Sequence, residues 1–497
     1  MKKNLQTKRL MSSAPISLAF LFSLGVVPPA LAQGVPAATP AQTAPSTSPV
    51  GTDNAAEANQ TPAAPTELWN RSNLFGDMAG IRPWLANYGV TVSLQETSEY
   101  LNNLSGGVKR GGAYDGVTQF GLVVDTEKAF GLSGGTFNAS GLQIHGSSLS
   151  QRNLLTLQSV SGIEADDTTR LWELWYQQSL PGGKMDVKVG QQSLDQEFMV
   201  SQYANLFMNA TFGWSVLPSI DLPAGGPAYP LSSLGVRVRT RISDALTVLA
   251  GVFDGNPAGS DGGDPQKQNA HGTNFNLHNG ALFIGEVQYA INQPPATRSD
   301  AQPAGLPGRY KLGVWYNTQR FADQRFDNTG LSLANPASTG IAQSHTGNYS
   351  FYAVADQMVW RPGAESPKSL GVFARIMGAP GDRNLIDLGV NAGVTLKAPL
   401  KGRDNDVVGV AVGYAKIGSH ARGLDGDTGT FTTPGFPVRS AETILEATYQ
   451  YQVAPWWQLQ ADFQYVFHPA GGIPNPNDPS ERVRNEAVVG VRTNITF

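Results

Sequence analysis

The sequence predicts an all-β protein, a transmembrane antiparallel β-barrel of about 16 strands with long extracellular loops and short periplasmic turns. Three observations support this fold class. Short runs with a hydrophobic period of two recur from about residue 67 to the end of the chain. Long and short connections mostly alternate between these runs, as in an up-and-down barrel. Only 15% of the residues are charged, against roughly 25% in typical soluble domains, so the apolar faces need a solvent other than water.

The first 32 residues have the features of a secretory signal peptide. Four basic residues precede an apolar stretch at 16–27 that is too short to span a bilayer, and an A-L-A cleavage site follows at 30–32. An uncleaved N-terminal anchor is the less favoured alternative. Residues 33–66 are rich in Ala, Pro and Thr, and we expect a disordered linker because they carry too little apolar surface to offset the entropy of ordering. Residues 67–497 are then predicted to form an outer-membrane barrel.

The composition excludes several classes of protein. The chain contains no cysteine, which excludes disulfides and thiolate metal sites. Its formal net charge is -4 at pH 7 and it has no basic block, which argues against a nucleic-acid partner. No apolar run of 18 residues follows the signal peptide, so we expect no transmembrane helix. An exported β-protein with 56 glycines and few charges is therefore assigned to the outer membrane.

Sixteen strands are predicted in all, after a short amphipathic segment at 74–89. They lie near residues 90–101, 116–126, 135–146, 170–180, 184–192, 232–243, 246–254, 280–291, 309–319, 349–361, 369–378, 387–398, 407–417, 441–453, 456–467 and 486–497. Short turns are predicted at 181–183, 243–245 and 454–455, and longer loops near 147–169, 193–231, 255–279, 320–348, 418–440 and 468–485. The connection at 292–308 is longer than a periplasmic turn should be.

The last strand, 487–497, shows the alternation clearly. Its odd-numbered positions are largely apolar and end on Phe497, whereas its even-numbered positions include Arg492 and Asn494. We expect the odd-numbered face to meet lipid and the even-numbered face to meet water. Pairing of this strand with the first strand would close the barrel and leave no edge.

Other strand faces also suit a barrel with a wet lumen. Arg237, Arg239 and Arg241 share one face, which suits water but not a dry core. Aromatic residues such as Trp172 cluster near strand ends, as interfacial girdles require. Barrels of about sixteen strands leave a channel. The loop at 193–231, stiffened by four prolines, is the best candidate to fold inward and narrow it.

The predicted lumen-facing set mixes acids, amides, bases and aromatics. Its members, the candidate channel-lining and substrate-binding residues, are Glu173, Trp175, Gln177, Lys188, Arg237, Arg239, Arg241, Glu286, Trp315, Arg375, Glu446, Gln450 and Gln464. An anion channel would show a one-signed ring of Arg or Lys. A neutral polyol instead needs donors, acceptors and an aromatic platform, for which Trp175 and Trp315 are the candidates. The set favours neutral, hydroxyl-rich solutes, while mixed charges that only keep a lumen wet are the alternative.

Catalytic and metal sites are not indicated. G-L-S-G-G at 131–135 matches G-x-S-x-G, but a nucleophile elbow needs a strand before it and a helix after it, and here the motif joins two strand runs. The six histidines are scattered, and the neighbours His271 and His278 lack the i, i+4 spacing of a helical metal site. We therefore expect no catalytic residue, no metal and no cofactor.

A series of motifs runs through the chain in a fixed order. They are L-F-G-D-M-A-G-I-R-P-W-L-A-N-Y-G-V at 74–90, L-W-E-L-W-Y-Q-Q at 171–178, K-V-G-Q-Q-S-L-D-Q-E-F at 188–198, Y-P-L-S-S-L-G-V-R at 229–237, G-V-F-D-G-N-P at 251–257, Y-A-V-A-D-Q at 352–357, E-A-T-Y-Q-Y-Q-V-A-P-W-W-Q-L-Q-A-D-F-Q-Y-V-F-H-P at 446–469 and V-V-G-V-R-T-N-I-T-F at 488–497. In this order the chain resembles the carbohydrate-selective porin family (OprB-type) of Gram-negative outer membranes, from about residue 68 to the end.

The resemblance implies a sixteen-stranded barrel that passes monosaccharides by facilitated diffusion, with a constriction lined by Arg, Glu and Trp. It also implies that Glu173 and Glu446 are lumen-facing acids and that Arg237 occupies the family's Gly-x-Arg. The chain departs from the family in two places. The linker at 33–66 is not part of the family pattern, and Q-Q-S-L-D at 191–195 lacks the lysine expected before the aspartate.

We predict a multi-pass porin of the cell outer membrane that carries out no enzymatic reaction and passes carbohydrates through a mixed-charge, aromatic-flanked constriction. Its expected partners are small-molecule sugars, outer-membrane lipid and the barrel-assembly machinery, and a homotrimer is one option for its assembly. Phe497 resembles the terminal aromatic that this machinery recognises. The alternatives are a porin for other small hydrophilic or organic-acid solutes, an outer-membrane hydrolase that uses Ser133, and a soluble periplasmic sugar-binding sandwich.

Overall fold

The structure is a computed structural model of the chain, and it describes residues 67–259, 263–293 and 305–497. The predicted signal peptide at 1–32 and linker at 33–66 lie outside the described residues, as does most of the connection at 292–308. In the described part of the chain, no helix is both long enough and apolar enough to cross a membrane.

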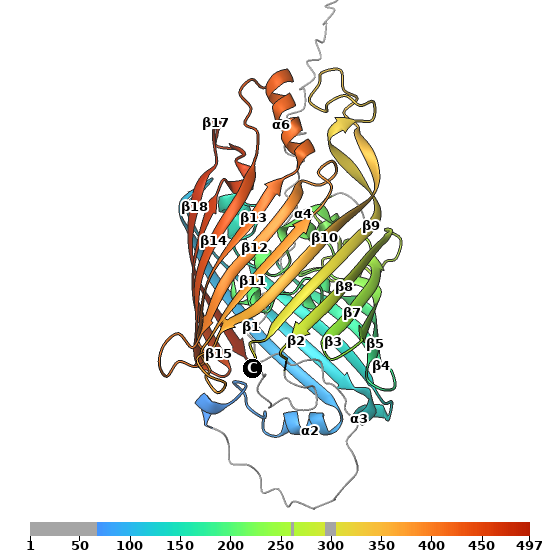
Figure 1. Ribbon diagram of the computed structural model, residues 1–497, viewed down its shortest axis with the longest axis vertical. Helices are drawn as coiled ribbons and strands as arrows, with labels where there is room; N and C mark the ends of the chain where they lie inside the picture. Colours follow the sequence, from blue (N-terminus) through green and yellow to red (C-terminus); the bar gives the residue numbers. More distant parts are fainter. Residues whose placement is uncertain (1–66, 260–262, 294–304) are drawn as a thin grey trace, which may run out of the picture.

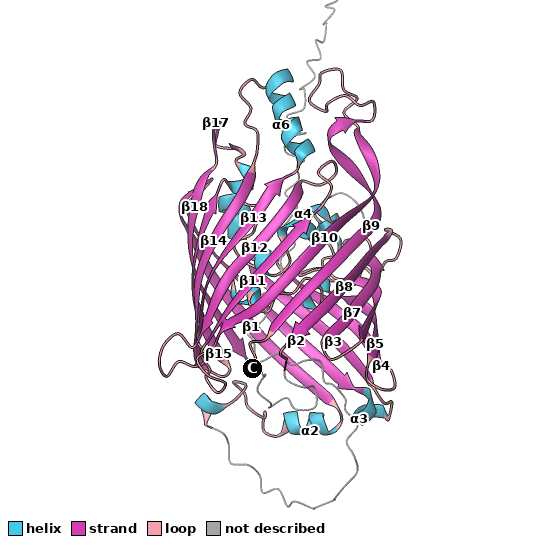
Figure 2. Cartoon of the chain, in the orientation of Figure 1, coloured by secondary structure: helices cyan, strands magenta, loops and turns pink. Residues whose placement is uncertain are grey.

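Sixteen antiparallel strands form a closed barrel in which the first strand, β1, pairs with the last, β18 (Figures 1 and 2). The barrel strands are β1 Val90–Gly107, β2 Gly111–Asp125, β3 Gly135–Gly146, β4 Thr168–Ser179, β5 Met185–Gln192, β6 Ser233–Arg241, β7 Leu246–Asp254, β8 Ala281–Ile291, β9 Gly308–Asp327, β10 Ala342–Trp360, β11 Ser369–Gly378, β12 Ile386–Lys397, β13 Val407–Ile417, β14 Ala441–Ala454, β15 Trp457–Phe467 and β18 Arg484–Thr496. A small separate sheet, β16 Pro474–Asn475 and β17 Asp478–Arg482, lies in the loop between β15 and β18.

The helices are short and belong to the connections and the N-terminal segment. They are α2 Ile81–Asn87, α3 Thr126–Phe130, α4 Val216–Asp221, α5 Pro265–Gln268, α6 Ser419–Phe431, the π-helical turn η2 Ser150–Leu154 and the 3₁₀ turns η1 Leu68–Asn70, η3 Leu194–Gln196, η4 Ala204–Leu206, η5 Ala210–Phe212, η6 Pro223–Gly225 and η7 Pro469–Gly471. α6 stands in the predicted loop 418–440, where no helix was expected, and projects beyond the barrel wall (Figure 1).

All sixteen predicted strands are present, and the larger differences concern strand length. β9 and β10 continue together into the predicted loop 320–348, so that this connection is mostly a hairpin that extends beyond the barrel (Figure 1). The tip of the hairpin is organised by Asp327, which is 0% exposed. Its carboxylate accepts the backbone N–H groups of Thr329 at 2.9 Å, Leu331 at 2.9 Å and Thr339 at 2.8 Å. Such a contact set is not visible in a strand periodicity.

The two faces of the barrel wall differ as the alternation predicts. On β18, Val489 and Val491 are 36% and 54% exposed on the outer face, whereas Val488 and Glu486 are 0% exposed on the inner face. Arg492 is 3% exposed, and its Nε donates a hydrogen bond to the carboxylate of Glu99 on the inner face of β1. The outer face of this closing strand is therefore apolar, and its inner face carries the polar groups.

Trp172 lies inside the barrel, so its prediction as a girdle residue was wrong. The β3–β4 register shifts between Ser140 and Gly141, opposite Glu173 and Leu171, which leaves Trp172 as the extra residue of a bulge. Trp172 is 2% exposed and belongs to an interior apolar cluster. The bulge places Trp172 and its neighbour Glu173 on the same, inner side.

The N-terminal segment packs against the end of the barrel where the chain terminates (Figure 1). Arg82 of α2 donates a hydrogen bond to the backbone carbonyl of Phe497. The rings of Phe75 and Phe497 lie 5.3 Å apart, centroid to centroid. The amphipathic segment predicted at 74–89 therefore covers the C-terminal residue.

Candidate channel constriction

The barrel interior contains residues 193–231, the segment expected to fold inward, which we call the inner segment. It leaves β5, passes through several short helical turns including α4, and returns to β6. Its large apolar side chains Phe198, Phe212, Trp214 and Tyr229 are at most 1% exposed. Figure 1 shows α4 and its neighbours within the ring of strands. The lumen is thus occupied by ordered chain.

Strand carboxylates hold the inner segment by its backbone. Glu286 on β8 accepts the N–H of Met199 at 2.8 Å, and Asp356 on β10 accepts that of Gln202 at 3.0 Å. Glu446 on β14 accepts the N–H groups of residues 208 and 209 at 2.5 and 3.0 Å. The three acids are at most 3% exposed. Each therefore satisfies backbone donors that would otherwise be buried without a partner.

Strand bases bind the backbone carbonyls of the same segment. Arg375 on β11, 1% exposed, donates to the carbonyls of residues 199 and 213 at 3.1 and 2.7 Å, and to that of residue 211. Lys311 on β9 donates from Nζ to the carbonyl of Val200 at 2.7 Å. The inner face of β8–β14 is consequently a docking surface for the inner segment.

A second stretch, residues 147–167, also enters the lumen. Glu442 on β14 accepts the N–H groups of residues 157 and 158, both at 2.8 Å, and Gln464 on β15 donates to the carbonyl of Val160 at 2.7 Å. This stretch pairs with the inner segment, because the N–H of Ala210 donates to the carbonyl of Ser159 at 2.9 Å. The two inserted segments brace one another.

Glu164 links the two ends of the second stretch by hydrogen bonds. Its carboxylate accepts the N–H groups of Leu149 at 2.9 Å and Ser150 at 3.1 Å, and the hydroxyl of Ser148 at 2.9 Å. Burial raises the pKa of Glu164 to about 7, because desolvation of the carboxylate outweighs these hydrogen bonds. The charge of this carboxyl group therefore changes near neutral pH.

A cluster of charges faces the inner segment from β5 and β6. Glu197 of the segment contacts Lys188 and pairs with Arg237, whose Nε and Nη2 lie 2.6 and 2.8 Å from its carboxylate oxygens. Arg237 also binds Asp186, which accepts Nε of Arg239 at 2.7 Å. Burial alone would raise the pKa of Glu197, but the positive charges of Lys188 and Arg237 lower it to about 2.

Three predicted residues on β4 surround this cluster. Nζ of Lys188 lies 4.4 Å from the centroid of the Trp175 ring, a cation–π contact. Gln177 accepts from Nη2 of Arg237 at 3.0 Å, and Glu173 accepts the N–H of residue 193 at 3.0 Å. The structure thus brings together Glu173, Trp175, Gln177, Lys188, Arg237 and Arg239, all of them predicted. Among these residues the Arg239 side chain is 37% exposed, and the side chain of Glu197, which pairs with Arg237, is 21% exposed.

The remaining predicted residues are inward-facing but mostly covered. Trp315 is 1% exposed and packs with Phe198 and Trp214, so its prediction as an open aromatic platform was wrong, because the inner segment covers it. Gln450 is 3% exposed beside its ladder partner Gln460. Arg241 is exposed at the end of β6. Glu286, Arg375, Glu446 and Gln464 hold the inserted segments, as described above.

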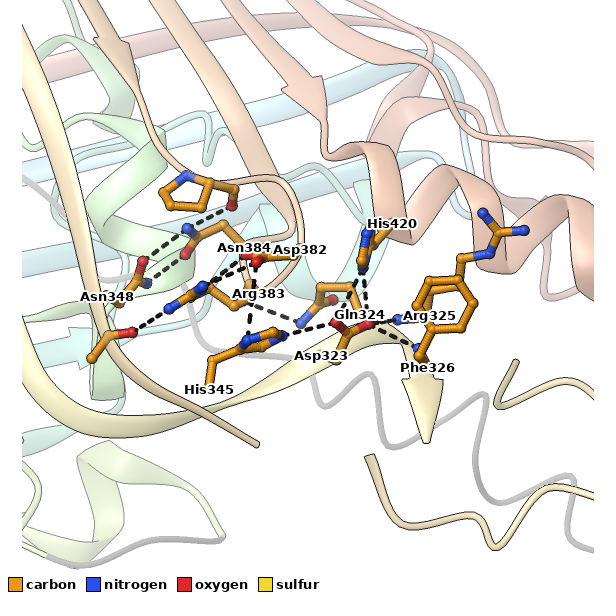
Figure 3. A network of polar contacts seen from close by, with 12 residues as sticks. Asp323, Gln324, Arg325, Phe326, His345, Asn348, Asp382, Arg383, Asn384 and His420 are labelled. Atoms are coloured by element: carbon orange, nitrogen blue, oxygen red, sulfur yellow. Dashed lines mark hydrogen bonds and ion pairs between the residues drawn. The ribbon is translucent and has the colours of Figure 1, made fainter. Parts of the chain in front are cut away.

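Glu197 was missed, although it lies within the motif at 188–198. The sequence did hold a signal for it: Glu197 lies in the loop that was expected to fold inward, and the inner face of the next strand carries a row of arginines. The contacts of His345 and His420 were also missed, because they come from separate connections. Figure 3 shows both imidazoles against the carboxylate of Asp323, at 2.8 and 2.9 Å. This network fastens α6 to the β9–β10 hairpin.

The hydrolase alternative finds no support at Ser133. The G-x-S-x-G stretch follows α3 and precedes β3, the reverse of the strand-then-helix order of a nucleophile elbow. The Ser133 hydroxyl donates to Glu127 at 3.1 Å. Within the described ranges, no group of three or more His, Asp or Glu side chains is arranged to hold a metal ion.

Residues 109–497 match the family described as carbohydrate-selective porin, OprB family. The chain belongs to this family. It is 25% identical to Porin B of Pseudomonas aeruginosa over 465 residues, which cover 87% of this chain and 92% of that protein. A high-pH structure of Pseudomonas putida OprB superposes with a TM-score of 0.72 at 23% identity, covering 86% of this chain and 99% of the other. The low-pH structure has a TM-score of 0.52 at 18% identity over the same shares.

Family membership and the closed barrel make this chain an outer-membrane carbohydrate porin, a multi-pass protein of the outer membrane. They point to a channel rather than an enzyme. The resemblance stated from the sequence motifs is confirmed.

Proposed function

We propose that this porin gives facilitated diffusion of monosaccharides through a constriction where Glu197 and Arg239 are exposed to the solute, with Lys188 and Arg237 buried behind them and Trp175 beside the cluster. The pairing of the charges supports this most directly. Three bases share the carboxylates of Glu197 and Asp186, so each base has an acidic partner and the cluster offers hydrogen-bond donors and acceptors close together. A neutral polyol can exchange hydrogen bonds with such a surface, whereas a one-signed ring would select ions.

The position of the two inserted segments in the lumen favours transport of small solutes. Residues 147–167 and 193–231 both bond to the inner faces of strands on the far side of the lumen. Ordered chain in the lumen reduces the width that a solute can use. We therefore propose that monosaccharides pass more readily than disaccharides.

Liposome swelling tests the proposed solute class. We expect faster swelling with glucose than with a disaccharide, and also faster swelling than with gluconate, an acid of nearly the same size as glucose. The shared carboxylates explain the second difference, because they offer an anion no base that lacks an acidic partner. Equal rates for glucose and gluconate would contradict the proposal while leaving the barrel intact.

A porin for organic acids or other small hydrophilic solutes is the second candidate, and one observation favours it. The Arg239 side chain is 37% exposed although it pairs with Asp186. Planar-bilayer reversal potentials in a salt gradient decide between the candidates. A strong anion preference would support this second function over the first.

We also propose a route of assembly. The signal peptide at 1–32 is cleaved, the linker at 33–66 precedes the barrel, and the barrel-assembly machinery recognises the C-terminal strand through Phe497 before homotrimers form. Deletion of Phe497 should lower the amount of folded porin in the outer membrane without changing the conductance of the channels that do insert. An unchanged amount in quantitative immunoblots of outer membranes would contradict this role.

A further inference from the structure

A polar cavity lies between the second inserted stretch and the β7–β8 connection, and we call it the outer cavity. Its volume is about 400 Å³, which is within the range of small-molecule binding sites. One wall comes from residues between 146 and 152 and between 164 and 170, and the other from α5 and Ala270. Trp175 of the proposed constriction lies five residues beyond Arg170 on β4, roughly 15 Å further along the strand. The outer cavity is therefore a separate site.

The outer cavity lies at the end of the barrel that carries the long loops. Neighbouring barrel strands run in opposite directions, so the connections that follow β3, β7 and β13 leave at the same end. α6 follows β13 and stands at the end opposite to α2 and the C-terminus (Figure 1). In outer-membrane barrels the long loops face the outside of the cell. A solute that arrives from outside therefore meets this cavity before it meets the constriction.

Hydrogen bonds between the two walls fix the shape of the outer cavity. The backbone N–H of Asp166 donates to the amide oxygen of Gln266 at 2.8 Å, and the Thr168 hydroxyl donates to the carbonyl of Ala270 at 2.9 Å. Arg170, which is 2% exposed, donates from Nη2 to the carbonyl of Gln266 at 3.3 Å. The walls come from separate connections, so these bonds hold the site in a preformed shape.

The lining of the outer cavity carries both signs of charge. Its basic side chains are Arg152, Arg170 and Lys267, and its acidic side chains are Glu164, Asp166 and Asp167. An anion would meet three acidic groups here, and a cation would meet three basic groups. A sugar hydroxyl can donate to a carboxylate and accept from a base. The mixed lining therefore favours a neutral, hydroxyl-rich ligand over an ion.

The uncharged lining groups suit the same kind of ligand. The hydroxyls of Ser147 and Ser148 and the amide of Gln151 can each donate and accept hydrogen bonds. Nη1 of Arg152 donates to the Ser147 hydroxyl oxygen at 2.8 Å, so the proton of that hydroxyl points away from Arg152. A preformed cavity lined in this way admits a hexose together with ordered water.

We propose that the outer cavity binds a free, neutral monosaccharide at the mouth of the channel. This adds a second sugar site to the constriction and rests on the solute class proposed above. Transport through successive sites requires weak binding at each of them, so that the solute leaves as readily as it enters. Hydrogen bonds to the lining replace hydrogen bonds to water, so their net gain is small. We expect a dissociation constant for glucose in the millimolar range.

Protection of an introduced thiol tests this site, because the natural chain has no cysteine. Ala270→Cys and Gln151→Cys place single thiols on the two walls of the cavity, and Ala337→Cys is the matched control in the exposed β9–β10 connection. The rate of alkylation by a maleimide is measured on the purified, folded porin with and without glucose. At about four times the dissociation constant, glucose should slow alkylation of both cavity thiols about fivefold, because only about a fifth of the sites remain free.

The control thiol and a charged ligand decide whether the protection is specific. Glucose should leave the alkylation rate of Ala337→Cys unchanged, and gluconate should protect none of the three thiols. Unprotected cavity thiols, equal slowing of all three thiols, or protection by gluconate as strong as that by glucose would overturn the proposal. Heat-modifiable migration confirms that each variant is folded, and a single misfolded variant leaves the other cavity thiol to decide.

Two further measurements separate this site from the constriction. Addition of Glu197→Gln to Ala270→Cys changes the constriction and should leave the glucose protection unchanged. Loss of protection in that double variant would place the bound glucose at the constriction and overturn the proposal. Liposome swelling of the natural protein reports transport by itself. Swelling with glucose but no thiol protection would refute only the outer cavity, whereas protection without swelling would refute only the transport proposal.

Discussion

The two walls that face the inner segment hold it in different ways. On the β5–β6 side, Glu197 meets Lys188 and Arg237 through ion pairs between side chains. On the β8–β14 side, buried acids such as Glu446 accept backbone N–H groups, and Arg375 donates to backbone carbonyls. Backbone contacts fix the course of the segment, whereas side-chain ion pairs can exchange partners with a solute. One wall is therefore the anchor and the other is the candidate contact surface for solutes.

The largest expected effect comes from cutting the anchor. Glu446→Ala leaves the N–H groups of residues 208 and 209 buried without acceptors, at a cost of about 3 kcal/mol in the free energy of unfolding. We expect the inner segment to detach locally, so single-channel conductance should rise and discrimination between glucose and a disaccharide should fall. Urea unfolding in detergent and bilayer recordings measure both changes.

Leu445→Ala on the outer face of the same strand is the matched control for that variant. Leu445 is 40% exposed on the lipid side, so its truncation should leave the conductance at the natural value. A Glu446→Ala protein with natural conductance would show that the anchor is not needed to hold the segment.

The second variant changes the other wall and should alter selectivity more than stability. Glu197→Gln removes the negative charge between Lys188 and Arg237. The cluster then gains net positive charge, and we expect a several-fold rise in anion over cation permeability, measured as a reversal potential in a salt gradient. Asp195→Asn is the control, because Asp195 bonds to Ser193 rather than to a base. Identical shifts from both substitutions would refute a specific role for Glu197.

The smallest effect concerns pH and the second inserted stretch. The pKa of Glu164 is about 7 in the folded protein, above its ordinary value of 4.5, so the folded state holds the proton more tightly. The free energy of unfolding should fall as pH rises from about 5 to 7, by at most about 1.4 kcal/mol per pH unit, and then level off. Glu164→Gln should flatten this dependence in urea unfolding at several pH values. An unchanged slope in that variant would assign the pH dependence to another group.

Much of the barrel follows from alternation alone. A period of two identifies a strand and assigns its faces, so residues such as Lys188 and Arg237 were correctly placed on the inner side. The alternation gave the wrong face for Trp172, because the extra residue of the β-bulge exchanges the inward and outward positions of the strand. The residue types around the bulge do not indicate that it is there. The alternation was also silent on β9 and β10, where Asp327 organises a turn that extends the hairpin.

The residues of the candidate site could be predicted to face inward, but what each of them contacts could not. Glu446 and Met208 are 238 positions apart, and only the folded chain shows that this acid holds a backbone N–H. Trp315 was predicted to face a solute and is covered instead, because inward orientation does not say what lies in front of a side chain. Loops that fold back into a lumen decide which inner residues remain accessible, and no strand pattern reports their course.

The seam between β1 and β18 has a consequence for the timing of biogenesis. Glu99 and Arg492 bond at 2.5 Å across this seam although they are 393 positions apart. A nascent chain without its final strand leaves the edge of β1 unpaired, so closure waits until translation and secretion are finished. Until the barrel closes, the edges of β1 and β18 have no strand partner and must be shielded from other chains.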